Sequence, residues 1–246
     1  MRCIRAYYYA CISFIDFQVG RLLKALEETG RLEDTLILFT SDHGELLGDF
    51  NCFGKRSMHA AAARVPLIAR LPGRFSGGAA CARPVSLVDI APTILAVSGA
   101  SLTSHPLDGV DLEEIASGRS RRPVVFSQFA EGPTSAGARA AHSTCMATTE
   151  RWKYFYSAPD DREFLFDRVQ DLSETRNRAG LPHCREALRD MKALLIGHLR
   201  AGGETAGLEG DDWRRFPRLS VPEDPDAGLL IQDQKWADLR IPGYSD

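Results

Sequence analysis

The first strong pattern along the chain is a helical one. Apolar residues recur every three or four positions, at Ile12, Ile15, Val19, Leu22, Leu23 and Leu26. Such a stripe predicts an amphipathic helix that begins almost at the start of the chain. Gly30 follows the last apolar position, where a residue with a left-handed backbone commonly ends a helix.

Three short apolar runs of strand length follow, at residues 35–40, 65–70 and 124–127. The first run, Thr35 to Thr40, is apolar without alternation, which is typical of a strand buried on both faces of a parallel sheet. A helical pattern over Asp89 to Val97 separates the second run from the third. Helix and strand therefore alternate up to about residue 130, which predicts an α/β sheet with helices on its faces.

The pattern changes beyond residue 130. Residues 152–156 and 163–167 flank a turn around Pro159 and predict an antiparallel hairpin, and apolar positions near Met191 predict a later helix. From Gly202 onward the chain is polar and rich in proline, which predicts an extended tail with isolated aromatic anchors. We therefore expect three parts: residues 1–130 from an α/β domain, residues 131–200 as a small antiparallel subdomain, and residues 201–246 as the tail.

Composition narrows the function classes. A formal net charge of -3 and a pI near 6.1 give no reason to expect nucleic acid or an anionic membrane as a partner. No apolar run reaches the roughly 20 residues that a membrane-spanning helix needs. The six cysteines form no C-x-x-C pair, which argues against a zinc or redox framework. We expect reduced thiols in a cytoplasmic protein.

Polar residues gather directly after the first predicted strand. Asp42 and His43 stand where ligands collect in open α/β sheets, outside the carboxyl end of a strand. A carboxylate beside an imidazole suits a divalent cation, and Lys55 adds a positive charge suited to a sulfate or phosphate. An Asp-His pair can also simply cap a helix or brace a loop. His59 is read as a candidate catalytic residue or as a packed or solvated histidine.

An ordered series of motifs resembles the sulfatase family of the alkaline phosphatase superfamily. The series consists of Thr40-Ser41-Asp42-His43-Gly44-Glu45-Leu46-Leu47-Gly48-Asp49, Gly54-Lys55, Arg64-Val65-Pro66-Leu67-Ile68, Pro84-Val85-Ser86-Leu87-Val88-Asp89-Ile90-Ala91-Pro92-Thr93, Arg151-Trp152-Lys153-Tyr154 and Asp171-Leu172-Ser173-Glu174-Thr175-Arg176-Asn177. The resemblance covers most of the chain up to about residue 200. It implies an alkaline-phosphatase-like mixed or parallel sheet with flanking helices, present here in part, followed by a small antiparallel subdomain.

The resemblance also implies a chemistry. Family members hydrolyse sulfate esters with a formylglycine nucleophile and one divalent metal, usually calcium and in some bacterial members manganese or magnesium. Asp42 and His43 match metal ligands of the family, and Lys55 matches the lysine that contacts the sulfate. The implied small-molecule partner is a sulfate ester, of a kind that the sequence does not specify.

Two departures from the family pattern shape these expectations. No C/S-x-P-x-R motif, the source of formylglycine, occurs in the 246 residues, and His59-Ala60 stand where the family usually has Tyr-Glu. We therefore expect a truncated sulfatase that is inactive alone, with exposed sheet edges and a tail that bind a second copy or a partner chain. A phosphonate or phosphate monoester hydrolase of the same superfamily and a non-catalytic binding module remain the alternatives.

Overall fold

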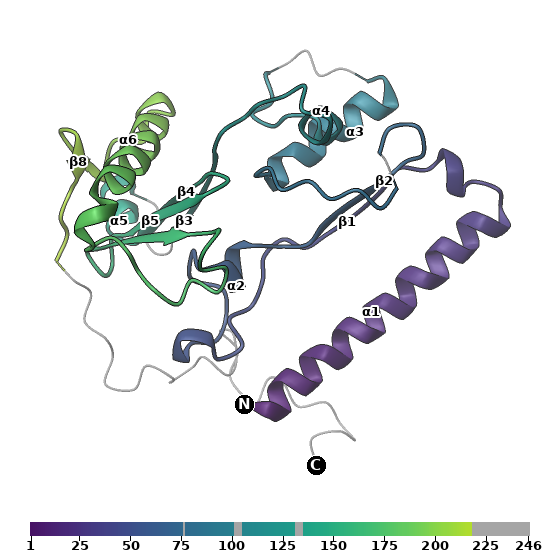
Figure 1. The fold of residues 1–246 in the computed structure, drawn as a ribbon, viewed down its shortest axis with the longest axis horizontal. Coiled ribbons are helices and arrows are strands. Elements are labelled where there is room, and N and C mark those ends of the chain that lie inside the picture. The colour runs from purple at the N-terminus through teal and green to yellow at the C-terminus, as the bar shows by residue number, and fades with distance from the viewer. Residues whose placement is uncertain (76, 101–104, 131–134, 218–246) are drawn as a thin grey trace.

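The computed structural model describes residues 1–75, 77–100, 105–130 and 135–217 (Figure 1). Its first element is helix α1, Arg2–Glu28, which confirms the helix predicted from the apolar stripe. Gly30 has a φ of 67°, and its N–H donates to Glu27 while the N–H of Arg31 donates to Leu26. This closing turn is the arrangement in which glycine relieves the strain of a left-handed backbone.

Strands β1, Ile37–Thr40, and β2, Leu67–Arg70, form a two-stranded sheet. The predicted strand positions are confirmed, but the expected parallel pairing is wrong for the described residues: Ile37 lies opposite Arg70 and Thr40 opposite Leu67, in antiparallel register. Nor is either strand fully buried, since Phe39 is 37% and Ile68 60% exposed. A short apolar run predicts burial and extension, but it carries no information about the direction of the neighbouring strand.

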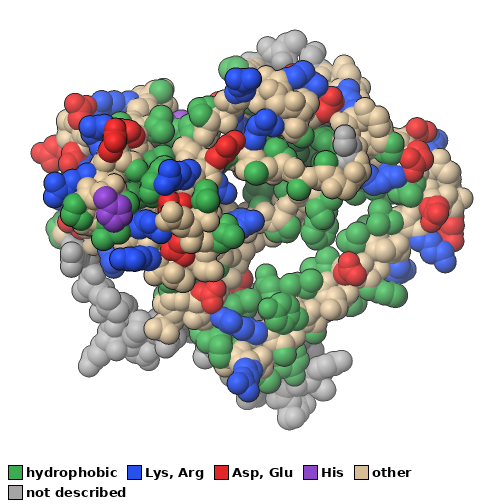
Figure 2. Space-filling model, viewed as in Figure 1, with side chains coloured by type: hydrophobic (Ala, Val, Ile, Leu, Met, Phe, Trp, Pro, Cys, Tyr) green, Lys and Arg blue, Asp and Glu red, His purple; other side chains and the backbone are tan. Residues whose placement is uncertain are grey.

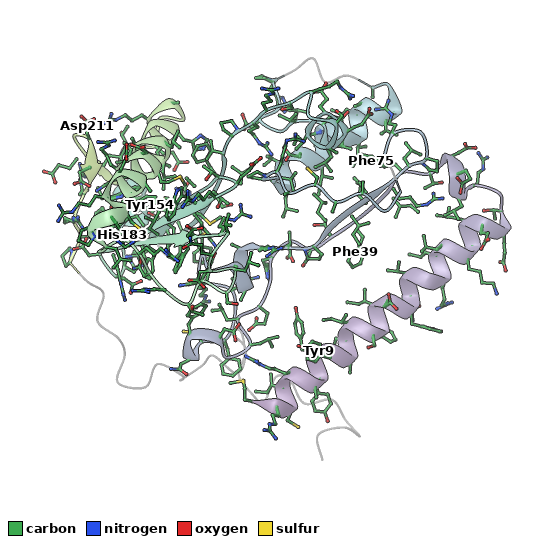
Figure 3. All side chains as sticks on the ribbon, viewed as in Figure 1. Tyr9, Phe39, Phe75, Tyr154, His183 and Asp211 are labelled. Atoms are coloured by element: carbon green, nitrogen blue, oxygen red, sulfur yellow. The ribbon has the colours of Figure 1, made fainter. Side chains whose placement is uncertain are left out.

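Helix α1 and the β1–β2 pair leave apolar side chains uncovered. No residue of α1 is buried, and Tyr7, Phe14 and Leu22 are each more than 60% exposed. Figure 3 places Tyr9 on α1 and Phe39 on β1 on the two sides of the space between helix and strands. Figure 2 shows an opening there, with hydrophobic side chains along both of its margins. The expected exposure of apolar faces is therefore present in this region.

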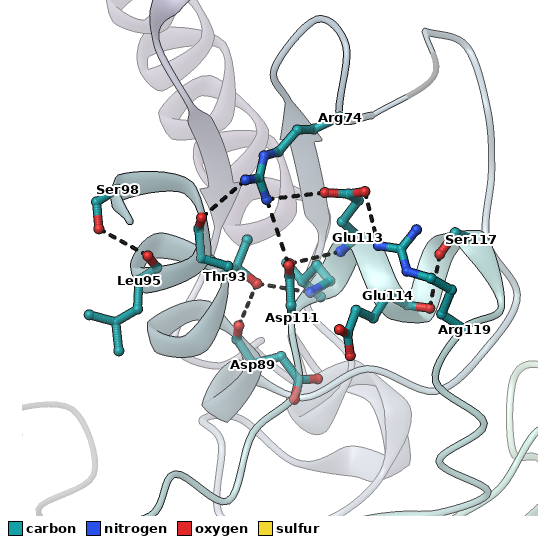
Figure 4. A network of polar contacts seen from close by, with 12 residues as sticks. Arg74, Asp89, Thr93, Leu95, Ser98, Asp111, Glu113, Glu114, Ser117 and Arg119 are labelled. Atoms are coloured by element: carbon teal, nitrogen blue, oxygen red, sulfur yellow. Dashed lines mark hydrogen bonds and ion pairs between the residues drawn. The ribbon is translucent and has the colours of Figure 1, made fainter. Parts of the chain in front are cut away.

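A layer of short helices lies above the β1–β2 sheet in Figure 1. It contains the 3₁₀ turn η3, Leu87–Asp89, then α3, Ile90–Ser98, and α4, Leu112–Ser117, so the helix predicted over residues 89–97 is confirmed. Asp89 is fully buried. Its two carboxylate oxygens accept hydrogen bonds from the two terminal guanidinium nitrogens of Arg122, at 2.6 and 2.5 Å. Figure 4 shows how Thr93 connects the backbone of Asp89 to α4, beside the Arg74 ion pairs with Asp111 and Glu113.

The C-terminal part is built on one antiparallel sheet. Its strands are β3, Val125–Ala130, β4, Ser143–Thr148, β5, Trp152–Ser157, and β6, Arg162–Asp167, in the order β3-β4-β5-β6. The predicted hairpin is confirmed as β5–β6. The predicted boundary between the first and second parts of the chain, at residue 130, falls at the end of β3. This sheet therefore combines a strand from before the boundary with three strands from after it. The short helix α5, Ala136–Ala141, lies between β3 and β4.

The main core lies between this sheet and α6, Arg185–Ala201, which is preceded by the 3₁₀ turn η4, Pro182–Cys184. Buried Tyr154 and Leu165 from the sheet meet Met191 and Leu195 from the helix, as the apolar pattern near Met191 predicts. The other 3₁₀ turns are η1, Leu32–Asp34, and η2, Asp49–Asn51, and the single-turn helix α2 spans Ala60–Ala63.

The chain after α6 packs against this core as far as residue 217. Two-residue strands β7, Leu208–Glu209, and β8, Asp212–Trp213, form a small hairpin. The ring of Trp213 is buried, stacks on Tyr156 and donates a hydrogen bond of 2.6 Å to the hydroxyl of Tyr154. The remainder of the predicted tail, including the anchor expected at Trp236, lies outside the described residues.

In the parts of the chain that the structure describes, no helix is both long and apolar enough to span a membrane.

Candidate functional site

Asp42 and His43 occupy the loop that leaves the carboxyl end of β1. The loop departs where β1 and β2 part, and Thr40 Oγ1 holds this point by donating to the carbonyl of Pro66 at 2.8 Å. The Ser41 hydroxyl then donates to the carbonyl of His43, also at 2.8 Å. The backbone N–H of His43 donates to Asp42 Oδ1 at 2.9 Å, and this hydrogen bond lowers the pKa of the Asp42 carboxyl. Asp42 therefore stands ready as an anion.

Lys55 meets this loop through the ring of His43. Lys55 Nζ lies 2.6 Å from His43 Nε2, and Asp42 Oδ2 lies 3.3 Å from the same nitrogen. His43 Nδ1 lies 2.9 Å from the carbonyl of Gly44. Because a carbonyl oxygen can only accept and a lysine ammonium can only donate, we assign the ring proton to Nδ1 and the lone pair to Nε2. The structure thus brings together Asp42, His43 and Lys55, three of the four predicted site residues, with the lone pair of His43 facing the ammonium of Lys55.

Glu45 positions Lys55, a role that the sequence did not reveal. Its carboxylate accepts the backbone N–H of Gly54 at 2.5 Å and that of Leu47 at 3.3 Å, and the N–H of Leu46 donates to the carbonyl of Gly54 at 2.9 Å. These bonds close the loop of residues 45–54 on itself, so the residue after Gly54 is returned to the Asp42–His43 turn. The position of Glu45 inside the Asp-His-Gly-Glu motif was the only sequence signal for it.

Gly44 is needed for close packing, because its backbone touches helix α2. Its N–H donates to the carbonyl of Ala62 at 2.7 Å, and a Cβ at this position would lie 2.0 Å from the carbonyl oxygen of Ala61. Gly44 does not have a positive φ, so its backbone conformation does not by itself require glycine. Only a residue without a side chain allows the Asp42–His43 loop to pack directly on α2.

The structure places His59 in an aromatic cluster. Its ring lies 4.1 Å from Phe50, and 5.1 to 5.7 Å from Phe155, Phe164 and Phe166, measured between centroids. His59 Nδ1 lies 2.6 Å from the hydroxyl of Ser57. Burial, followed by the charges of Lys153 and Arg162, lowers the pKa of His59 to about 4. The ring is neutral at pH 7, and its contacts are those of a packed histidine.

A cleft of about 1040 Å³ runs from these residues to the C-terminal sheet. Asp42, His43 and Lys55 line one part of it, and one face of the β3–β4–β5 sheet lines another, through residues such as Ser127, Thr148 and Lys153. The two parts are joined by Glu174, whose carboxylate accepts the N–H of Ala60 on α2 at 2.7 Å and the ammonium of Lys153 at 2.8 Å.

Asp42 and His43 fit a divalent metal as two of its ligands. The carboxylate oxygen and the unprotonated imidazole nitrogen are 3.3 Å apart, close enough for both to reach one ion, and this pair of donors suits a cation of intermediate hardness. Among the described residues, no group of three or more His, Cys, Asp and Glu side chains converges to hold a metal. The described residues therefore offer a pair of ligands.

Comparisons with known proteins agree on one family. Residues 3–100 match the family model for sulfatases. The chain is 37% identical to a choline-sulfatase of Rhizobium meliloti over 202 residues, which are 78% of this chain and 38% of that protein. It is 37% identical to arylsulfatase K of Xenopus laevis over 187 residues, 73% of this chain and 34% of that protein. The chain therefore spans a little over a third of the length of these curated relatives.

A solved structure shows the same fold. The phosphonate monoester hydrolase of Agrobacterium radiobacter superposes with a TM-score of 0.65 at 29% identity, over 86% of this chain and 45% of the hydrolase. The α/β fold class expected from the sequence is thereby confirmed for the part of the fold that this chain contains.

Proposed function

This chain belongs to the sulfatase family, and from that premise we propose that the protein hydrolyses small-molecule sulfate esters with the help of a divalent metal. Asp42 and His43 would supply two ligands of the ion, for which calcium is the first candidate and manganese or magnesium the others. The observation that carries this proposal is the convergence of the Asp42 carboxylate and the Lys55 ammonium on one nitrogen of His43, at 3.3 and 2.6 Å.

Each residue has a definite task in this proposal. A bound divalent ion would act as a Lewis acid on the oxygens of the sulfate group. Asp42, already ionised, and His43, held by Gly44 as the Nδ1–H tautomer, present an anion and a lone pair to that ion. Lys55 would contact the sulfate and counter the negative charge that develops as the ester bond breaks. Glu45 keeps Lys55 at this position by closing the loop before it.

Metal binding can be tested without turnover. Mn²⁺ titrated into the purified chain, with free Mn²⁺ followed by electron paramagnetic resonance, should give one weak site that Asp42→Asn or His43→Gln removes. Lys55→Met should tighten that site by about fivefold, since it deletes a positive charge within a few ångströms of the ion. Asp190→Asn, on the exposed surface of α6, is the matched control. An unchanged Mn²⁺ affinity in Asp42→Asn would refute the ligand assignment.

We also propose that the 246-residue chain alone does not turn over aryl sulfates, because no C/S-x-P-x-R motif occurs among its residues. Incubation with 4-nitrophenyl sulfate should release no nitrophenol above the buffer rate. Removal of a nucleophile costs on the order of six powers of ten in hydrolases where it has been tested, which positioning cannot restore. Turnover that disappears in Lys55→Ala would contradict this expectation.

A second candidate function is phosphonate or phosphate monoester hydrolysis. It is favoured by the similarity to the Agrobacterium radiobacter hydrolase, whose name states that activity. The same metal ligands and the same lysine suit either anion, so binding competition between sulfate and methylphosphonate at the Mn²⁺-loaded chain separates the two candidates.

Two further expectations stay part of this proposal. One is a cytoplasmic location, and the other is contact of the exposed sheet and the tail with a second copy or a partner chain. A non-catalytic binding module would show neither metal nor anion binding.

A further inference from the structure

The cleft holds a second group of positive charges apart from Lys55. Arg64, Arg83, Lys153 and Arg168 line it, against the carboxylates of Asp42, Glu150, Asp171 and Glu174. Several of these groups are already engaged. Lys153 pairs with Glu174, Arg83 donates to the carbonyl of Ile115 at 2.9 Å, and Asp171 accepts the backbone N–H groups of Thr175 and Arg176. None of these contacts involves Arg64 or Arg168.

Arg64 and Arg168 line the same cleft, and neither side chain pairs with a carboxylate among the described residues. Within the described ranges, the side chain of Arg64 makes no hydrogen bond or ion pair, and Arg168 donates only to the backbone carbonyls of Thr149 and Glu150. The pKa of Arg168 is lowered, first by burial and next by the charge of Arg64, while Glu174 and Glu150 act in the opposite direction. Arg64 is exposed and Arg168 is half-buried, and two guanidinium groups whose charges repel each other favour an anion between them.

A buried hydroxyl without a partner lies in the same wall of the cleft. Thr148 is 9% exposed, and its Oγ1 has no hydrogen-bond partner among the described residues. Thr148 lies opposite Lys153 in the β4–β5 register, so both side chains are on the face of the sheet that lines the cleft. Arg168 binds the carbonyl of the next residue, Thr149. An unsatisfied buried hydroxyl costs stability, and a bound oxyanion would accept its proton.

We propose that Arg64 and Arg168, with the hydroxyl of Thr148, form an anion subsite that binds a second negatively charged group of the substrate. The inference rests on the proposed function, because it concerns the remainder of the molecule whose sulfate group Lys55 would contact. The substrate class is then a sulfate ester that carries a further oxyanion, either a carboxylate or a second sulfate. Guanidinium groups bind both through paired, charge-assisted hydrogen bonds.

Binding of unreactive sulfonates to the purified chain tests the subsite. Isothermal titration would compare benzenesulfonate, which has one anionic group, with 3-sulfobenzoate and 1,3-benzenedisulfonate, which have two. The doubly charged probes should bind about tenfold more tightly, as expected for added hydrogen bonds to charged groups. A greater gain for 3-sulfobenzoate would identify a carboxylate as the preferred second group, and a greater gain for the disulfonate would identify a sulfate. Equal affinity for all three probes would overturn the proposal.

Variants locate the effect and separate it from the proposed function. Arg64→Gln or Arg168→Gln should abolish the advantage of the doubly charged probes, and Thr148→Val should reduce it about threefold without loss of stability, because its hydroxyl has no partner to lose. Arg189→Gln, on the exposed side of α6, is the control. Lys55→Gln should weaken all three probes by the same factor. If it weakens none, the proposed sulfate contact fails while the subsite stands; if the arginine variants keep the advantage, the subsite fails.

Discussion

The ammonium group of Lys153 lies 2.8 Å from the carboxylate of Glu174, and the two side chains are only 5% and 4% exposed. The second carboxylate oxygen of Glu174 accepts the N–H of Ala60, so this buried pair connects the C-terminal sheet to the helix on which the Asp42–His43 loop packs. Burial is the largest cause of the lowered pKa of Lys153, and the charges of Arg168 and Arg64 add to it, while Glu174 acts in the opposite direction. The pair is therefore a costly arrangement that holds two parts of the molecule in register.

Breaking this pair should be strongly destabilising. Lys153→Met or Glu174→Gln leaves one buried group without its partner, and the free energy of unfolding in urea should fall by about 3–5 kcal/mol. The double variant Lys153→Met with Glu174→Leu should recover much of that loss, since neither charge then remains buried. The control is Lys24→Met at the exposed Lys24–Glu28 pair of α1, where a change below about 0.5 kcal/mol is expected. Equal effects at the two pairs would contradict the buried role.

His59 should make the protein sensitive to mild acid. Its pKa is about 4 in the folded chain and near 6.5 in the unfolded chain, so the unfolded state takes up the proton first as pH falls. Stability should be complete above about pH 6.5 and decline down to about pH 4, by roughly 2 kcal/mol after allowance for solvent screening. Urea unfolding at pH 7.5 and pH 5 measures the difference.

Substitution of His59 by phenylalanine should flatten this decline, because the aromatic contacts remain while the titrating group is lost. His183→Gln, at an exposed histidine in η4, should leave the decline as it is in the unmodified chain. Acid sensitivity below pH 4 should persist in both variants. Asp167 keeps a lowered pKa, since hydrogen bonds from Gln170, Val169 and Arg151 outweigh the opposing effect of burial. An unaltered slope in His59→Phe would assign the mild-acid effect to another group.

Gly44→Ala should disturb the site more than the fold. The added Cβ would lie 2.0 Å from the carbonyl oxygen of Ala61, so the loop must move away from α2 and carry Asp42 and His43 with it. We expect Mn²⁺ affinity to drop at least about tenfold while the unfolding midpoint shifts by a few degrees. Gly197→Ala is the control, because a Cβ there, on α6, meets no atom within 4 Å. Retention of full Mn²⁺ affinity in Gly44→Ala would show that the close approach is dispensable.

Trp213 should hold the segment after α6 against the core. Its indole stacks on Tyr156 and donates to Tyr154, and the neighbouring Arg215 pairs with Asp161 at 2.6 Å. Trp213→Ala should cost about 3–5 kcal/mol and expose Arg214 and Arg215 to trypsin. Trp213→Phe keeps the stack and should slow this cleavage again. Rapid cleavage after Arg214 in the unmodified native protein would contradict the docked arrangement of residues 202–217.

The local elements could be predicted from the sequence because they depend on short-range pattern. The apolar stripe of α1, the turn at Gly30 and the alternation of the β5–β6 hairpin each reflect the geometry of one element and its solvent. The site residues Asp42, His43 and Lys55 were found in the same way, since a loop after an apolar strand is a local feature and the sulfatase motif is contiguous there. The structure brings these three side chains together.

The tertiary structure alone decided what depends on partners distant in the sequence. The antiparallel pairing of β1 with β2, the clamp of Glu45 on Gly54 and the packing of His59 among four phenylalanines are not encoded in any short pattern. Glu174 meets Ala60 across 114 positions of sequence, and the charge of Arg64 acts on Arg168 across a similar separation. A periodic pattern reports which face of an element is apolar, whereas strand direction, charge neighbours and close backbone approach follow from how the elements pack in three dimensions.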